Sequence, residues 1–215
     1  MLALRRAAFL DRDGVINRMF LHPEFGTVDS PANPEQFELL PGVGPAIAEL
    51  NRLGLLVIVV SNQPGIAKGK FTAPLLAAIE CKMRVDIKAG GGHLDAVYHC
   101  LHHPDAVLDE YRAACDCRKP QPGLLRQAAR DWQIDLSGSF MIGDGVTDIA
   151  AGCAVKATTL FVNSRKCYHC DSLAAHNAWP DYLVGDLQEA ALVIRRLEMG
   201  DRDWAQQFAL KCLAP

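Results

Sequence analysis

The stretch that decides the fold reads Ala7-Ala8-Phe9-Leu10-Asp11-Arg12-Asp13-Gly14. A short apolar run, of a length that suits a buried strand, ends here in two acids one residue apart and a glycine. Open α/β sheets bind their ligands at the carboxyl ends of the strands, so two carboxylates at this point suit a metal site or a reaction centre. The alternative is a strand followed by an ordinary polar turn.

Further apolar runs predict five more strands, at residues 55–60, 94–98, 140–142, 158–162 and 182–184. Helical patterns lie between them, from Gly42 to Gly54, from Thr72 through Met83, from Pro122 to Trp132, from near Asp148, and from Asp186 to Leu197. Alternating strands and helices with short connections predict a single α/β domain. We expect a Rossmann-like, doubly wound parallel sheet with helices on both faces.

The domain is expected to cover residues 1–197, and residues 198–215 to form a tail with a short docking helix around Trp204 and Phe208. The loop at residues 18–34 contains three prolines, so we expect it to be irregular and to lie over a site.

Composition excludes several classes of protein. With 215 residues, 50% hydrophobic and 22% charged, the chain suits a globular enzyme, and its net charge of −3 argues against a nucleic-acid partner. No run resembles a signal peptide or a membrane span, which predicts a cytoplasmic protein with no membrane partner. In that compartment, the eight cysteines are expected to be metal ligands or free thiols. A monomer is favoured, although the sequence leaves the oligomeric state open.

Polar residues follow three of the predicted strands. Asp11 and Asp13 follow the first, and Asp144 and Asp148 follow the fourth. Carboxylates that converge at one edge of the sheet suit Mg²⁺, which prefers hard oxygen ligands and keeps several waters. With a serine at 61 and a lysine at 119 to bind anionic oxygens, the set describes a phosphate site, although either residue alone is unremarkable.

Cysteine and histidine residues form a second group between the third strand and the third helix. Cys100 and His102 are two residues apart, as are Cys115 and Cys117, so each pair can face one ion from an extended chain. Three sulfurs and one imidazole make a closed tetrahedral set, which predicts a structural Zn²⁺. His103 is the competing fourth ligand.

Four motifs, taken together and in this order, resemble the haloacid dehalogenase-type phosphatases. They are Phe9 to Asn17, Ser61-Asn62-Gln63, Cys117-Arg118-Lys119-Pro120, and Gly143-Asp144 through Asp148. The intervening Cys-x-His and Cys-x-Cys loop narrows the resemblance to the zinc-containing branch of that family. The resemblance covers about residues 7 to 162, and it implies a minimal cap made of the loops at 18–34 and 100–117.

The resemblance also implies a mechanism. Asp11 is the nucleophile that forms an aspartyl-phosphate, and Asp13 is the general acid and base. Mg²⁺ is bound by Asp11, the backbone carbonyl of Asp13 and Asp144. Asp148 orients either Lys119 or a metal-bound water.

The same resemblance assigns the substrate-binding residues. Ser61, Lys119 and the amides near Asn62 and Gln63 bind the phosphoryl oxygens, and Arg118 reaches the leaving group or a second phosphate. The implied substrate is a small phosphorylated metabolite. The favoured one is D-glycero-D-manno-heptose 1,7-bisphosphate, from which the 7-phosphate is removed, and histidinol phosphate is the alternative within the class. A non-catalytic metal-binding scaffold is the alternative from a different class.

Two features depart from the family pattern. Gly145 stands where a basic residue usually contacts the substrate, and Lys156 and Arg165 are candidates to replace its charge. The segment at 163–179 is rich in cysteine and histidine (Cys167, His169, Cys170 and His176), but its spacing fits no standard closed zinc site. We therefore expect a surface loop there.

Overall fold

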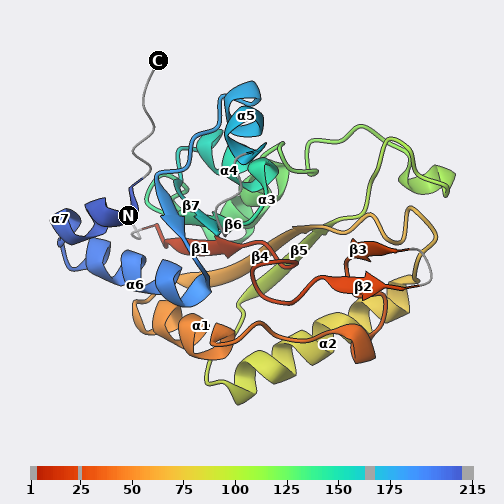
Figure 1. Cartoon of the computed structure of the whole chain (residues 1–215), viewed down its shortest axis with the longest axis horizontal. Coiled ribbons are helices and arrows are strands. Elements are labelled where there is room, and N and C mark those ends of the chain that lie inside the picture. The colour runs from red at the N-terminus through yellow and green to blue at the C-terminus, as the bar shows by residue number, and fades with distance from the viewer. Residues whose placement is uncertain (1–3, 24–25, 163–167, 210–215) are drawn as a thin grey trace.

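The computed structural model describes residues 4–23, 26–162 and 168–209, and it centres on a six-stranded sheet (Figure 1). The strand order is β5-β4-β1-β6-β7-β8, and every neighbouring pair is parallel. The strands are β1 (Ala7–Leu10), β4 (Leu56–Asn62), β5 (Ala96–Cys100), β6 (Phe140–Gly143), β7 (Thr158–Val162) and β8 (Tyr182–Val184). The predicted fold class and all six strands are confirmed.

The central strands are buried on both faces, which explains why they read as continuous apolar runs. On β1, Ala8 and Leu10 belong to one core cluster, whereas Ala7 and Phe9 belong to another on the opposite face. Successive side chains of a strand point to opposite faces, so one short apolar run contributes to two cores.

Helices cover both faces of the sheet (Figure 1). The larger core packs against α1 (Val43–Arg52), α2 (Ala73–Ala89) and α6 (Leu187–Glu198), and the smaller one against α3 (Gly123–Trp132) and α4 (Val146–Cys153). The short helix α7 (Arg202–Ala205) and the 3₁₀ helix η3 (Gln206–Phe208) follow α6 and bring Trp204 and Phe208 against the larger core. Among the described residues, no helix has the length and apolar character needed to cross a membrane.

Two segments that were expected to be irregular contain regular structure. Residues 18–34 hold an antiparallel hairpin, β2 (Phe20–His22) and β3 (Thr27–Asp29), followed by the 3₁₀ helix η1 (Pro34–Gln36). The prolines lie outside the two strands, so the backbone groups of the strands are free to pair with each other. In the segment 163–179, α5 (Tyr168–Ala175) replaces the expected loop, because Leu173 is buried in a small cluster with Ile149 and Phe161.

The chain order places a candidate site at one edge of the sheet. From β1 the chain moves outward through β4 and β5, then crosses to β6 and moves outward the other way through β7 and β8. Ligands bind at such a switch point, beside the carboxyl ends of the strands. The β2–β3 hairpin and the loop with η2 (Asp109–Tyr111) project beyond this same edge (Figure 1).

Candidate active site

Three carboxylates converge where β1 and β6 end. Asp11, Asp144 and Asp148 each offer an oxygen, and these oxygens lie within 4.8 Å of one another. Two glycines make room for them. A Cβ atom on Gly14 would lie 2.1 Å from Asp144 Oδ2, and one on Gly143 would lie 2.2 Å from Asp148 Cβ. The glycines of the first and fourth motifs therefore allow the acids to approach.

Lys119 is the cation within this group of acids. Its side chain is only 2% exposed, and Nζ lies 2.8 Å from Asp11 Oδ1 and 2.5 Å from Asp148 Oδ1. Nζ also donates to the carbonyl of Val60 at 2.7 Å. Burial lowers the pKa of Lys119, but the charges of Asp11 and Asp148 outweigh it and hold the pKa above its usual range. The ammonium is therefore charged at neutral pH.

Asn62 fixes the backbone of Lys119. Its side-chain amide donates to the Lys119 carbonyl at 3.0 Å, and its side-chain oxygen accepts from the Lys119 N–H at 3.0 Å. A residue at the end of β4 thus positions the lysine, although Lys119 lies 57 positions further along the chain.

The site carries more negative than positive charge. Burial and the nearby charges of Asp11 and Asp148 raise the pKa of Asp144 to about 7. Burial likewise raises the pKa of Asp148 to about 6, even though Lys119 acts in the opposite direction. Three clustered carboxylates facing one ammonium favour an additional cation, and oxygen ligands suit a hard divalent ion.

Asp13 lies in a separate polar group beside these acids. Its carboxylate accepts hydrogen bonds from Arg12, Asn17, Ser30 and Gln63. Burial raises the pKa of Asp13, but the Arg12 charge and the hydrogen bonds from Asn17, Gln63 and Ser30 outweigh it and hold the pKa below its usual range. The group is an ionised carboxylate at neutral pH.

The other predicted phosphate-binding residues lie at the same edge. Ser61 is 1% exposed and its hydroxyl accepts from Gln63 Nε2 at 3.0 Å. Gln63 is fully buried and its amide also donates to Asp13 Oδ2 at 2.7 Å, so its side chain supports two neighbours. Arg118 donates to the carbonyl of His102 at 3.3 Å, which ties it to the Cys/His loop.

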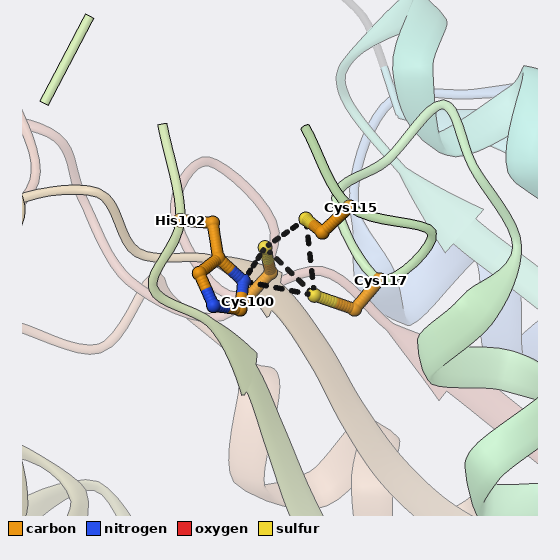
Figure 2. Close-up of side chains that lie close together, drawn as sticks. All are labelled: Cys100, His102, Cys115 and Cys117. Atoms are coloured by element: carbon orange, nitrogen blue, oxygen red, sulfur yellow. Dashed lines mark hydrogen bonds between the residues drawn. The ribbon is translucent and has the colours of Figure 1, made fainter. Parts of the chain in front are cut away.

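The Cys/His group closes into one cluster (Figure 2). The sulfur of Cys117 lies 3.1 Å from that of Cys100 and 3.3 Å from that of Cys115, and His102 Nδ1 lies 3.4 Å from it. Four ligands around Zn²⁺ with bonds of about 2.3 Å would be separated by roughly 3.8 Å, so a small expansion accommodates the ion. His103 is not part of the cluster. Its Nδ1 accepts the N–H of Asp105 at 3.0 Å instead.

The cluster adjoins the carboxyl edge of the sheet. Cys100 is the last residue of β5 and pairs with Asn62 of β4, and its carbonyl accepts the N–H of Gln63 at 2.8 Å. The loop that bears the thiols is therefore anchored directly beside the residues that hold Lys119 and Asp13.

Comparison with known proteins agrees with this geometry. A family model described as "HAD-hyrolase-like" matches residues 116–190. The D-glycero-beta-D-manno-heptose-1,7-bisphosphate 7-phosphatase of Photorhabdus laumondii subsp. laumondii is 38% identical over 191 residues, which is 88% of this chain and 97% of that protein. The chain belongs to the haloacid dehalogenase-type phosphatase family. An Escherichia coli K12 enzyme with the same description is 40% identical over 153 residues, 71% of this chain and 76% of that protein.

A solved structure supports the same relationship. The D,D-heptose 1,7-bisphosphate phosphatase of B. bronchiseptica, complexed with magnesium and phosphate, aligns with a TM-score of 0.72 and 31% identity. The alignment covers 89% of this chain and 99% of that one. These relatives confirm the predicted haloacid dehalogenase-type phosphatase family, and membership makes this chain a phosphoric monoester hydrolase.

Three residues around Asp13 in this haloacid dehalogenase-type phosphatase were not predicted to belong to the site. Arg12 stands between two acids at the end of a buried strand, and this position is a sequence signal that its charge is paired. Asn17 is the last residue of the first motif, and its position alone indicates no role. Ser30 gave no signal, since it follows a hairpin that the prolines had concealed.

Lys156 was one of the two residues expected to replace the charge missing at Gly145, and the structure places it away from the site. Lys156 precedes β7, at the amino edge of the sheet, so the expectation that it reaches the substrate is wrong. Arg165 and Cys167 lie outside the described residues, as do the side chains of His169 and Cys170. His176 is exposed, and its Nδ1 lies 2.9 Å from the carbonyl of Ser172.

Proposed function

We propose that this phosphatase removes the 7-phosphate of D-glycero-D-manno-heptose 1,7-bisphosphate through an aspartyl-phosphate on Asp11. The observation that carries the reaction is the arrangement of Asp11 beside buried, charged Lys119 and two further carboxylates. The substrate rests on the relatives, two of which carry that description at 38% and 40% identity. The scaffold alternative has no observation in its favour.

The proposed reaction has two displacements. An oxygen of Asp11 attacks phosphorus and the bond to the sugar oxygen breaks, while Asp13 protonates the departing oxygen. Asp13 then takes a proton from water as the water attacks phosphorus, which releases phosphate and restores Asp11. Lys119 neutralises charge on the phosphoryl oxygens, Ser61 donates a hydrogen bond to one of them, and Asp148 holds Lys119 in place.

Asp13 needs a proton for the first displacement, although its pKa is low in the substrate-free protein. A phosphate dianion that enters the site is a like charge beside Asp13, and a like charge disfavours the carboxylate. Substrate binding therefore raises the pKa of Asp13 at the moment when the proton is required.

The proposed cofactors are a catalytic Mg²⁺ and a structural Zn²⁺. Asp11, the carbonyl of Asp13 and Asp144 would hold Mg²⁺, which supplies charge neutralisation at the phosphoryl group. The four ligands of the Cys/His cluster make a closed set, so Zn²⁺ there would stabilise the loop and take no part in the reaction.

The second phosphate of the proposed substrate needs positive charge away from the nucleophile. We assign this role to Lys68 and Arg118, because each lies close enough to His103 for its charge to lower the pKa of that side chain, although burial is the larger cause. Lys68 is exposed and lies in the loop that follows β4. This pair takes the role that Gly145 leaves open.

A substrate comparison tests the proposal. Phosphate release is measured with the two anomers of heptose 1,7-bisphosphate, histidinol phosphate and simple sugar monophosphates. We expect kcat/KM for one heptose bisphosphate anomer to exceed the others by at least about tenfold, since a second bound phosphate contributes charge-assisted hydrogen bonds. A higher kcat/KM for histidinol phosphate would overturn the substrate and leave the reaction class intact.

Binding of Mg²⁺ should strengthen as the pH rises. The metal binds the ionised form of Asp144, whose pKa is about 7, so apparent affinity is expected to rise about tenfold between pH 6 and pH 8. The raised pKa of Asp148 also makes Mg²⁺ binding stronger at higher pH. Calorimetric titration across this range measures the effect, with Asp144→Asn as the test variant and Asp203→Asn, an exposed acid on α7, as its control.

The same shift affects the metal-free protein in the opposite sense. Asp144 binds its proton more tightly when folded than when unfolded, so the free energy of unfolding should fall as pH rises from about 4 to about 7. Saturating Mg²⁺ should remove this fall. A metal affinity that is constant from pH 6 to pH 8 would contradict the assignment of Asp144.

A further inference from the structure

The four partners of Asp13 come from different parts of the chain. Arg12 and Asn17 flank it in the loop after β1, and Gln63 follows β4. Ser30 directly follows β3, and its hydroxyl donates to Asp13 Oδ2 at 2.9 Å. Among these described partners, Ser30 is the one that the β2–β3 hairpin supplies.

Three of the partners are held firmly by the sheet and its loops. Arg12 is 1% exposed and also donates to Gln63 Oε1 at 3.0 Å. Asn17 is fully buried, and its amide also donates to the carbonyl of Arg18 at 2.8 Å. These bonds fix the orientation of both amides and of the guanidinium, so each can only donate toward Asp13.

Ser30 is held differently. Its N–H donates to Asp29 Oδ1 at 2.8 Å, and the other carboxylate oxygen of Asp29 forms an ion pair with Lys70. Lys70 lies in the exposed end of the loop after β4. One continuous set of contacts therefore runs from that loop through Asp29 and Ser30 to Asp13.

The chemistry of the hydroxyl suits proton transfer. Guanidinium and amide N–H groups can only donate, whereas a hydroxyl can donate or accept by rotating its hydrogen. When Asp13 carries the proton, before the first displacement and after the second, the hydrogen bond to Ser30 can reverse and persist. The N–H groups of Arg12 and Gln63 that donate to Oδ2 cannot reverse, so these contacts weaken when that oxygen carries the proton, whereas Asn17 can keep donating to Oδ1.

We propose that Ser30 is a positioning residue for proton transfer by Asp13, and that the Asp29–Lys70 ion pair holds Ser30 in place. The inference rests on the proposed role of Asp13, and it adds the hairpin as the element that positions the acid. Proton transfer thereby depends on how the hairpin sits against the loop after β4.

Replacing Ser30 tests this inference through the leaving group. With heptose bisphosphate, whose leaving alkoxide needs a proton, Ser30→Ala is expected to lower kcat about tenfold and change KM less than about twofold. With p-nitrophenyl phosphate, whose leaving phenolate needs no proton, the rate of aspartyl-phosphate formation in a single turnover should stay unchanged. Ser30→Thr keeps the hydroxyl and should restore most of kcat.

Two matched variants test the role of the Asp29–Lys70 ion pair. Lys70→Gln removes the partner of Asp29 and should reproduce part of the Ser30→Ala effect with the same dependence on the leaving group. Lys82→Gln breaks a comparable exposed ion pair, with Asp86 on α2, and should leave both substrates unaffected.

Equal losses on both substrates in Ser30→Ala, or no rescue by Ser30→Thr, would mean that the residue acts only on structure and would overturn the inference. Unchanged kcat in Ser30→Ala would also overturn it. Asp13→Asn separates this failure from a failure of the proposed function. If Asp13→Asn loses activity on heptose bisphosphate while Ser30→Ala does not, only the inference about Ser30 fails. If Asp13→Asn retains activity, the proposed role of Asp13 fails as well.

Discussion

Replacement of Asp11 by asparagine is expected to abolish phosphate release while the protein stays folded. The variant keeps the size of the side chain but replaces the carboxylate that we propose as the nucleophile, one oxygen of which lies 2.8 Å from Lys119 Nζ. Loss of a covalent nucleophile removes the route through the aspartyl-phosphate, so kcat should fall by at least about 10⁴-fold. Phosphate release measured with heptose bisphosphate gives the activity, and circular dichroism with thermal unfolding gives the fold.

The folded state should tolerate this change well. Asp11→Asn removes one of three clustered carboxylates, and Asp148 still neutralises Lys119 at 2.5 Å. The charge of Asp11 contributes to the raised pKa of Asp144, so that pKa should fall in the variant. Asp203→Asn serves as the control for a lost surface acid, and near-normal activity in Asp11→Asn would overturn the assignment of the nucleophile.

The features that the sequence predicted well are those that depend on local and general rules. A run such as Leu56–Val60 is long, apolar and β-branched enough to be a buried strand in any α/β protein. Once the strands are parallel, their carboxyl ends share one edge, so Asp11, Ser61 and Asp144 are expected at that edge. The short Cys-x-His and Cys-x-Cys spacings predicted the cluster for a local reason, since residues two apart in an extended chain face the same way.

The features that the sequence did not reveal depend on long-range pairing. Arg12 is buried because Gln63, 51 residues away, accepts from it and Asp13 neutralises it. The hairpin strands have three residues each, too few for an alternating pattern to stand out among the prolines. Ser30 therefore had no local signal, and its contact with Asp13 emerged only from the folded structure.

The Cys/His cluster and the acids are connected through the end of β5. The carbonyl of Cys100 accepts the N–H of Gln63, and Gln63 in turn donates to Asp13 and Ser61. A change that releases the thiol loop thus removes a support of Asp13, the proposed acid and base. Zinc in this position would stabilise the active edge of the sheet without touching the substrate.

Removal of one thiol should therefore lower both the zinc content and the free energy of unfolding. Cys117→Ala deletes the sulfur that lies within 3.4 Å of the other three ligand atoms. We expect the zinc content to fall from about one ion per chain to near zero. The free energy of unfolding should fall by at least about 3 kcal/mol, since the binding energy of a structural zinc is part of the folding energy. Elemental analysis and denaturant unfolding give the two values.

Cys153→Ala supplies the control, because Cys153 is an exposed thiol at the end of α4 and lies outside the cluster. It should keep both zinc and stability.

A pair of histidine variants identifies the fourth ligand. His102→Ala should lose zinc and His103→Ala should retain it, because His102 Nδ1 faces the sulfurs and His103 Nδ1 accepts a backbone N–H. Wild-type protein with a zinc content near zero would exclude the four-ligand site, and the raised pKa of the buried Cys100 thiol would then describe an ordinary protonated thiol.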